Sequence, residues 1–373
     1  MDGPKDRNQN TNTPVASRCR SSGVAARSRT RTAGIRALVP WWMVFLIGAL
    51  PVAAANRLEL VWPTPNPAWA EGRPAEQWLQ HAGSGDPQSG NYGGVRSAGA
   101  QFHEGIDIKP VARDRRGEPL DSVFAAMAGV VRHLSMSSGA SSYGRYVVLE
   151  HPGASPAVYT LYAHLARIDP ALRVGSPVAA GAVLGTIGYS AGGYTIPKDR
   201  AHLHFEVGVV VTRDFQAWYN RRKFGSRNPH GIWNGMNLLG LDPLAFFDDW
   251  RAGRINQVQD FFERMETVAT VRIATFNTPD FVTRYPSLLT KPLPLGPVAG
   301  WEIRFGWTGV PFSWTPLTVS EVTGMKLNQP QIVEVNAALD RRERSKSLAV
   351  SRRGGWTVGR DLQTVLQQLF GIP

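Results

Sequence analysis

Cysteine is nearly absent from this chain of 373 residues, since the single one, Cys19, lies within the first 36 positions. The remainder therefore cannot form a disulfide and cannot offer a thiolate to a metal ion. Any metal site in that remainder must be built from histidine and carboxylate side chains.

A dense basic surface is missing as well. The formal net charge is +12, and residues 1–36, with eight Lys or Arg and two acids, contribute +6 of it. The rest of the chain is only mildly basic, and no cluster of Lys and Arg interleaved with aromatic residues occurs outside 212–239. Nucleic acid is therefore not an expected partner.

One long stretch without charge occupies residues 37–55 and ends in small residues suited to signal-peptidase cleavage. It follows the polar, basic residues 1–36, which we expect to be disordered. Because the basic side comes first, we expect the rest to be exported to the periplasm or cell envelope. Residues 37–55 are then either a cleaved signal peptide, which the prolines and the Ala-rich end favour, or an anchor in the inner membrane. An uncleaved anchor would be the protein's contact with the membrane.

Glycine and proline are plentiful, at 38 and 27 residues, which indicates many turns and a mainly β fold. The length and the hydrophobic content of 43% suffice for a sizeable core and about two domains. Residues 56–90, rich in Pro, Gly and Trp, predict an irregular arm that packs on the main domain, with one short helix near 74–81.

Residues 91–248 alternate short β runs with Gly and Pro, which predicts an antiparallel sheet rather than βαβ units. The expected strands are 123–134, 146–150, 158–164, 183–187 and 202–211.

Residues 249–373 predict a separate, mixed α+β region of unknown function, in which we find no motif and no repeat. Its periodicity predicts helices at 249–266 and 361–370 and strands at 268–276 and 301–307.

Histidines and one aspartate supply the candidate chemistry. His202 and His204, two residues apart on an expected strand, share one face. His103 and Asp107 lie four apart on an expected extended path and share a face too. Two His and one carboxylate match the three-ligand set of a catalytic zinc, which leaves a fourth position for water. The spacing does not decide between His202 and His204 as the ligand. His164 ends another expected strand and reaches the same groove if that strand neighbours 202–211.

Five motifs occur in an order that resembles the lysostaphin-like, or LytM-type, zinc metallopeptidases. They are Gly-Val-Arg (94–96), Phe-His-Glu-Gly-Ile-Asp-Ile (102–108), Gly-Arg-Tyr-Val-Val-Leu-Glu-His (144–151), Tyr-Ala-His-Leu (162–165) and His-Leu-His-Phe-Glu-Val (202–207). The resemblance covers about 91–248. It implies a small antiparallel β-sheet domain with a substrate groove. It also implies that the protein hydrolyses peptide bonds in the cross-links or stem peptides of bacterial cell-wall peptidoglycan.

Carried over by motif, the resemblance makes His103, Asp107 and His204 the ligands of one zinc ion per chain. His202 and His164 become the catalytic pair, which exchanges protons or stabilises the tetrahedral intermediate beside the metal. For Glu206 two roles stay open, orientation of one imidazole or an ordinary ion pair. Glu104 should face away from the site, because it alternates with His103 on the expected strand.

The sequence departs from the family pattern in two places. Residues 189–201 are longer than the usual turn and are expected to remodel the rim of the groove. Residues 212–239 form an insertion, which we expect to be a solvated loop with a few packed aromatics. The alternative is a rim that contacts glycan or an anionic wall polymer.

Three functions are compatible with these observations. The favoured one is a zinc endopeptidase whose partner is peptidoglycan, because all five site residues are present. The alternatives are a non-catalytic envelope regulator that activates other wall hydrolases, and a wall-binding scaffold that acts through residues 249–373.

Overall fold

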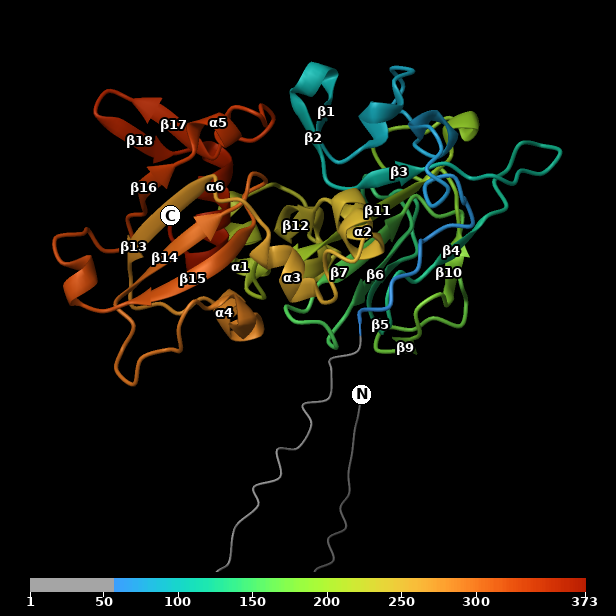
Figure 1. Cartoon of the computed structure of the whole chain (residues 1–373). Helices are drawn as coiled ribbons and strands as arrows, with labels where there is room; N and C mark the ends of the chain where they lie inside the picture. The colour runs from blue at the N-terminus through green and yellow to red at the C-terminus, as the bar shows by residue number, and fades with distance from the viewer. Residues whose placement is uncertain (1–56) are drawn as a thin grey trace, which may run out of the picture. The chain divides into compact units, whose positions relative to one another are not determined.

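The computed structural model describes residues 57–373, so the expectations for 1–36 and 37–55 lie outside the described residues. All the described residues belong to one compact unit (Figure 1). Within this part of the chain, no helix is both long and apolar enough to cross a membrane. The mainly β, antiparallel fold expected from the sequence is confirmed.

A seven-stranded sheet forms the centre of the first half, with strands in the order β12-β11-β7-β6-β5-β9 and with β3 paired to β11. All the pairings between these strands are antiparallel. The strands are β3 (Ile106–Ile108), β5 (Gly129–Ser135), β6 (Tyr146–Glu150), β7 (Tyr159–Ala163), β9 (Pro177–Val178), β11 (Leu203–Val210) and β12 (Leu238–Leu241).

Strand β11 is buried along its whole length. Because successive side chains of a strand point to opposite faces, Leu203, Phe205 and Val207 enter the main hydrophobic cluster while His204 and Glu206 face the other side. The apolar face thus holds the strand in place and leaves the polar face to build a site.

The expected strands agree with the structure except where the chain changes sheets. The prediction for 146–150 is confirmed to the residue, and 158–164 and 202–211 differ by one residue at each end. The expected strand 123–134 is wrong as a single element. Its first part is β4 (Ser122–Phe124), which pairs with β10 (Val183–Thr186) in a separate three-stranded sheet completed by β8 (Arg167–Ile168).

The extended path expected at 102–108 is also broken. His103 ends β2 (Gln101–His103), which pairs with β1 (Gly93–Arg96), whereas Asp107 lies in β3. The break falls at Gly105, where a Cβ atom would lie 2.3 Å from the backbone oxygen of Phe205.

The arm before the sheet packs as an aromatic wrap. Trp62 stacks on Trp69 with ring centroids 4.3 Å apart, and Phe247 meets Trp62 edge-on at 5.2 Å. The short helix expected near 74–81 is reduced to a 3-10 turn, η1 (Ala75–Gln77). Further 3-10 turns are η2 (Pro87–Gly90), η3 (Ser97–Gly99), η4 (Lys198–Arg200), η5 (Gly231–Trp233), η6 (Gly235–Asn237), η7 (Pro286–Leu288) and η8 (Ser320–Val322).

A four-stranded antiparallel sheet, in the order β15-β14-β13-β16, forms the centre of residues 249–373, called the C-terminal half below. The expected strands at 268–276 and 301–307 and the helix at 361–370 are confirmed within two residues at each end. The elements are β13 (Ala269–Ala274), β14 (Gly300–Phe305), β15 (Pro311–Leu317), β16 (Gln331–Val335), the hairpin β17 (Ala349–Arg352) and β18 (Gly355–Val358), α4 (Asp280–Arg284), α5 (Ala337–Asp340) and α6 (Arg360–Phe370).

The single helix expected at 249–266 is two helices, α2 (Pro243–Arg251) and α3 (Val258–Glu263). Asp242 caps the first by accepting from the backbone N–H groups of Leu244 and Ala245. Gly253, with φ of 69°, adopts the left-handed conformation that follows the end of α2. Buried side chains from both halves belong to one hydrophobic cluster. The division expected near residue 248 stays a prediction.

His151 predicts an acid-sensitive fold. The buried imidazole hydrogen-bonds Ala128 O and Thr160 Oγ1, and burial lowers its pKa to about 4. Below pH 6.5 His151 becomes protonated in the unfolded chain but stays neutral in the folded chain until the pH nears 4. Stability present above that pH is therefore lost as pH falls toward 4, by roughly 3 kcal/mol.

Thermal unfolding of the wild type and His151→Gln between pH 7 and pH 4 would measure this. We expect His151→Gln to be less stable at pH 7 but to lose less stability over the range. A parallel loss in both proteins would contradict the assignment.

Candidate metal centre

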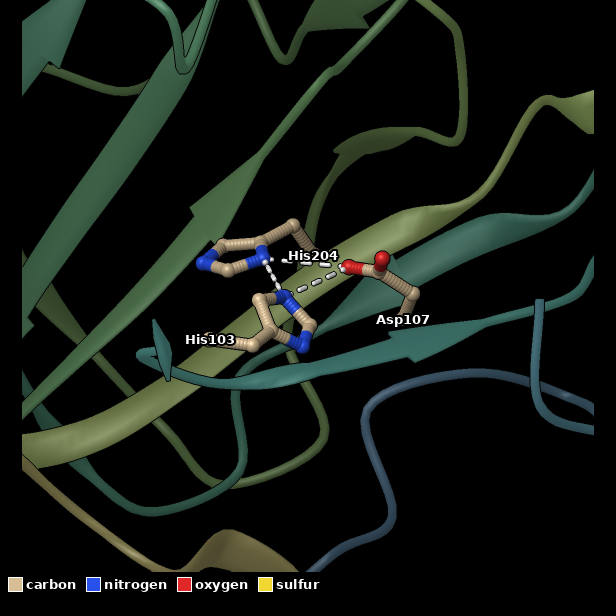
Figure 2. Close-up of side chains that lie close together, drawn as sticks. All are labelled: His103, Asp107 and His204. Atoms are coloured by element: carbon tan, nitrogen blue, oxygen red, sulfur yellow. Dashed lines mark hydrogen bonds and ion pairs between the residues drawn. The ribbon is translucent and has the colours of Figure 1, made fainter. Parts of the chain in front are cut away.

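Strand pairing places the candidate ligands. His204 of β11 lies directly opposite Asp107 of β3 in the antiparallel register, and His103 reaches the same point from the end of β2. Figure 2 shows the three side chains converging on one spot. They are 1, 2 and 5% exposed for His103, Asp107 and His204.

Three atoms face one another in this group. His103 Nε2 lies 2.9 Å from His204 Nδ1. Asp107 Oδ1 lies 3.1 Å from His204 Nδ1 and 3.2 Å from His103 Nε2. Tetrahedral zinc with bonds of about 2.0–2.1 Å separates its ligand atoms by roughly 3.3 Å, so the spacing is close to that of a zinc site.

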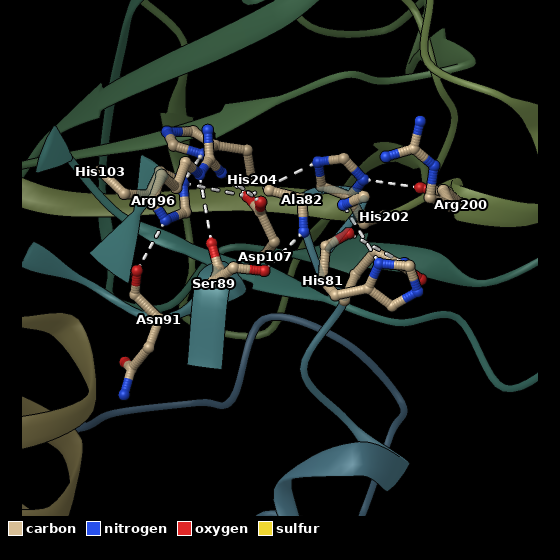
Figure 3. Close-up of polar contacts among 12 residues, drawn as sticks. His81, Ala82, Ser89, Asn91, Arg96, His103, Asp107, Arg200, His202 and His204 are labelled. Atoms are coloured by element: carbon tan, nitrogen blue, oxygen red, sulfur yellow. Dashed lines mark hydrogen bonds and ion pairs between the residues drawn. The ribbon is translucent and has the colours of Figure 1, made fainter. Parts of the chain in front are cut away.

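The outer atoms of the same side chains are each fixed by a second partner, as Figure 3 shows for His103 and Asp107. His103 Nδ1 contacts Asn91 O at 2.7 Å, and because a carbonyl only accepts, Nδ1 carries the proton. His204 Nε2 lies 2.9 Å from Glu206 Oε1, and Arg96 Nη2 donates to Asp107 Oδ2 at 2.6 Å. These contacts leave His103 Nε2, His204 Nδ1 and Asp107 Oδ1 as lone-pair donors toward the centre.

The electrostatics of the group also favour a cation. Burial alone would lower the pKa of His204, but its bonds to Asp107 and Glu206 raise that pKa to about 9. The two carboxylates thus stabilise positive charge at this imidazole, and a metal ion bound at Nδ1 would take the place of the proton held there. Burial would likewise raise the pKa of Asp107, yet the neighbouring His103 and His202 hold it well below its usual range. Buried lone pairs converging between two carboxylates fit a divalent metal ion, and the residues are those that bind zinc.

Glu206 is fully buried, which excludes a surface role, and its contact with His204 Nε2 is both a hydrogen bond and an ion pair. Its Oε1 also accepts from Tyr143 Oη at 2.6 Å, and its Oε2 accepts from Tyr159 Oη at 2.8 Å. Burial, and then the charge of Glu206, raises the pKa of both tyrosines well above the usual value, so they stay protonated as donors. The sequence analysis missed both tyrosines.

The two remaining histidines lie beside the metal ligands and are held alike. His164 Nδ1 contacts Ser190 O at 2.9 Å, and His202 Nδ1 contacts Arg200 O at 2.7 Å. Their rings meet edge to face with centroids 4.8 Å apart. Burial lowers the pKa of His202 and takes that of His164 well below its usual value. Both are therefore neutral near pH 7 with Nε2 as the proton acceptor, and His202 Nε2 lies 3.5 Å from Asp107 Oδ1.

His164 has an unusual backbone conformation, with φ of 61° in the left-handed region. Such a conformation costs a non-glycine residue about 1–3 kcal/mol and persists only where the surroundings enforce it. Here the N–H groups of His164 and Leu165 donate to Tyr143 O and Arg145 O just beyond the end of β7.

A groove of about 690 Å³ lies over these side chains. Glu104 lines it, so the expectation that this residue faces away is wrong. The strand ends at His103, and the alternation does not extend to the next residue. His81 lines the groove as well. Tyr194, Ile196 and Arg200, from the long segment 189–201, form part of the rim.

The insertion 212–239 is more ordered than a solvated loop. It contains α1 (Phe215–Arg222), whose Phe215, Trp218 and Tyr219 form a small buried cluster. None of its residues lines the groove over the candidate metal ligands, but His230, Asn234 and Met236 line an adjoining cleft of about 500 Å³.

Comparison with known proteins adds a family. The model of peptidase family M23 matches residues 101–215, and no curated protein matches the chain. The chain is similar to the catalytic domain of the prophage-encoded M23 protein EnpA from Enterococcus faecalis. That alignment has 22% identity and a TM-score of 0.25, and it covers 35% of this chain and 79% of that one.

Two further structures show similar values. The catalytic domain of lysostaphin from Staphylococcus simulans aligns at 22% identity over 43% of this chain and 87% of that one, with a TM-score of 0.25. A zinc containing peptidase from Vibrio cholerae aligns at 21% identity over 41% of this chain and 37% of that one, with a TM-score of 0.27. The segment 101–215, which matches the model of peptidase family M23, holds all five of the site residues expected from the sequence.

Proposed function

We propose that this protein is a zinc-dependent endopeptidase that hydrolyses peptide bonds of bacterial cell-wall peptidoglycan. The observation that carries the proposal is the set of three buried lone-pair donors, His103 Nε2, Asp107 Oδ1 and His204 Nδ1, with each outer atom fixed by another partner. Two neutral imidazoles lie beside them in one groove. The match of residues 101–215 to the model of peptidase family M23 supports the same reaction class.

The chain's own residues supply the proton transfers. Bound zinc would lower the pKa of water and polarise the scissile carbonyl. The Nε2 atom of His202 or His164 accepts the proton released by the attacking water, since both Nδ1 atoms are held by carbonyls. The imidazolium formed then donates to the tetrahedral intermediate or to the leaving amine. Arg96 and Glu206 keep Asp107 and His204 oriented throughout.

We further propose that the protein works in the periplasm or cell envelope. The support is the charge-free stretch 37–55 behind a basic leader. Peptidoglycan lies outside the cytoplasm, so this location agrees with the proposed substrate. A non-catalytic regulator is less well supported, because all three ligands and both imidazoles are present.

Zinc content and cleavage test the proposal together. The purified full chain should carry about one zinc ion and should release muropeptides from purified sacculi, as detected by mass analysis. His103→Ala should lose both the metal and the activity. His164→Ala should keep the metal but lose at least about 100-fold in rate, because it lacks one proton acceptor. A wild type with full zinc content and no cleavage of any sacculus preparation would refute the endopeptidase and favour the regulator.

Arg96 provides a test of the metal centre itself. Arg96→Ala should weaken zinc affinity by about 10–100-fold, since Asp107 Oδ2 loses the donor that orients the carboxylate. Arg96→Lys should retain part of the wild-type zinc affinity. Competition with a chromophoric chelator measures the affinity. Arg132→Ala, which removes an arginine paired with Glu150 away from the groove, is the matched control. Equal zinc affinity in Arg96→Ala and the control would show that Asp107 needs no such partner.

A further inference from the structure

A second cleft opens beside the metal centre, and the C-terminal half forms one of its walls. Its volume is about 500 Å³. It joins the groove over the metal ligands along one edge, because four residues line both hollows: Phe102, Glu104, Ser142 and Tyr143. The facing wall includes Thr308, Lys346 and Gln368 from the C-terminal half.

This wall makes direct contacts with residues 91–248. Glu343 Oε2 accepts from Gly94 N at 2.9 Å, two residues before Arg96. Gln368 Nε2 donates to Met236 O at 2.8 Å, and Trp307 meets Tyr92 edge-on at 5.5 Å. The C-terminal half is therefore held in place as one wall of this cleft.

Two charged groups of opposite sign in the cleft lack a charged partner. Lys346 Nζ lies 4.1 Å from the centroid of the Phe102 ring, a cation–π contact, and forms no ion pair with any described residue. Glu104 is half-buried and has neither a hydrogen bond nor an ion pair within the described part of the chain. Partly desolvated charges without partners are costly, so groups of opposite charge on a ligand would relieve both.

The position of these charges relates them to the reaction. Phe102, beneath Lys346, immediately precedes the ligand His103 on β2, and Glu104 immediately follows it. A peptide that occupies the cleft therefore continues directly into the groove over the metal ligands. Contacts in the cleft would then fix which peptide bond reaches the reacting centre.

We propose that this cleft is a second substrate subsite, which binds a peptide segment carrying a carboxylate at Lys346 and an ammonium group at Glu104. The inference rests on the proposed function, since stem peptides built on a diamino acid present both groups. The subsite requires the C-terminal half, so it extends beyond the matched segment 101–215.

Kinetics with matched variants test the subsite. The probes are muropeptides released from purified sacculi by a muramidase, and the proteins are zinc-loaded full chains. Lys346→Met and Glu104→Gln should each raise KM about tenfold while kcat and zinc content hold, because each removes a charge-assisted contact to the substrate. Lys346→Arg should retain most of the affinity. The controls are Lys326→Met and Glu334→Gln, at exposed positions that do not line the cleft.

Chemical change of the probe gives an independent readout. Amidation of the muropeptide carboxylates should abolish the difference between the wild type and Lys346→Met, as expected for two changes to one contact. If both variants cleave the unmodified probe like the wild type, the subsite is refuted while the endopeptidase stands. If the wild type cleaves nothing, calorimetric binding of the same muropeptides decides. A Kd raised about tenfold in Lys346→Met supports the subsite without hydrolysis, and an equal Kd refutes it.

Discussion

The simultaneous pairing of β11 with β3 and β7 is the constraint on which the metal centre depends. It sets His204 opposite Asp107 on one side and opposite Ala163, the neighbour of His164, on the other. Alternate side chains of the strand enter the hydrophobic cluster, so the burial of Leu203, Phe205 and Val207 positions the polar face. Hydrophobic burial therefore fixes the distances between groups that take no part in the core.

The alternation of side chains along strands was enough to predict the features that depend on it alone. It placed His202 and His204 on one face and located the strand 146–150 to the residue. It did not reveal the carbonyls of Asn91, Ser190 and Arg200, which accept from Nδ1 of three histidines and so fix their tautomers. Any residue type supplies a main-chain carbonyl, so no sequence signal marks those positions. Tyr143 was missed because its contact with Glu206 joins positions 63 residues apart.

Local breaks account for the other errors. Glu104 was expected to point away because the strand was assumed to continue through Gly105, which in fact separates β2 from β3. The single helix expected at 249–266 was wrong because Gly253, a residue that commonly ends helices, was not taken into account. Two strands of the C-terminal sheet, β13 and β14, were predicted, but the sheet's contribution to a cleft beside the candidate metal centre depends on tertiary contacts such as that of Glu343 with Gly94.

Gly105 also sets a mechanical tolerance for the site. A methyl group there would meet the Phe205 backbone oxygen at 2.3 Å and Glu206 Cγ at 2.9 Å. Phe205 and Glu206 both lie in β11, the strand that carries His204, and Glu206 is the residue that orients His204. Even the smallest side chain would push β3 away from β11 and disturb both the spacing and the aim of the ligand atoms. The hydrogen atom of one glycine thus sets how closely β3 can approach β11, and with it the spacing of His204 and Asp107.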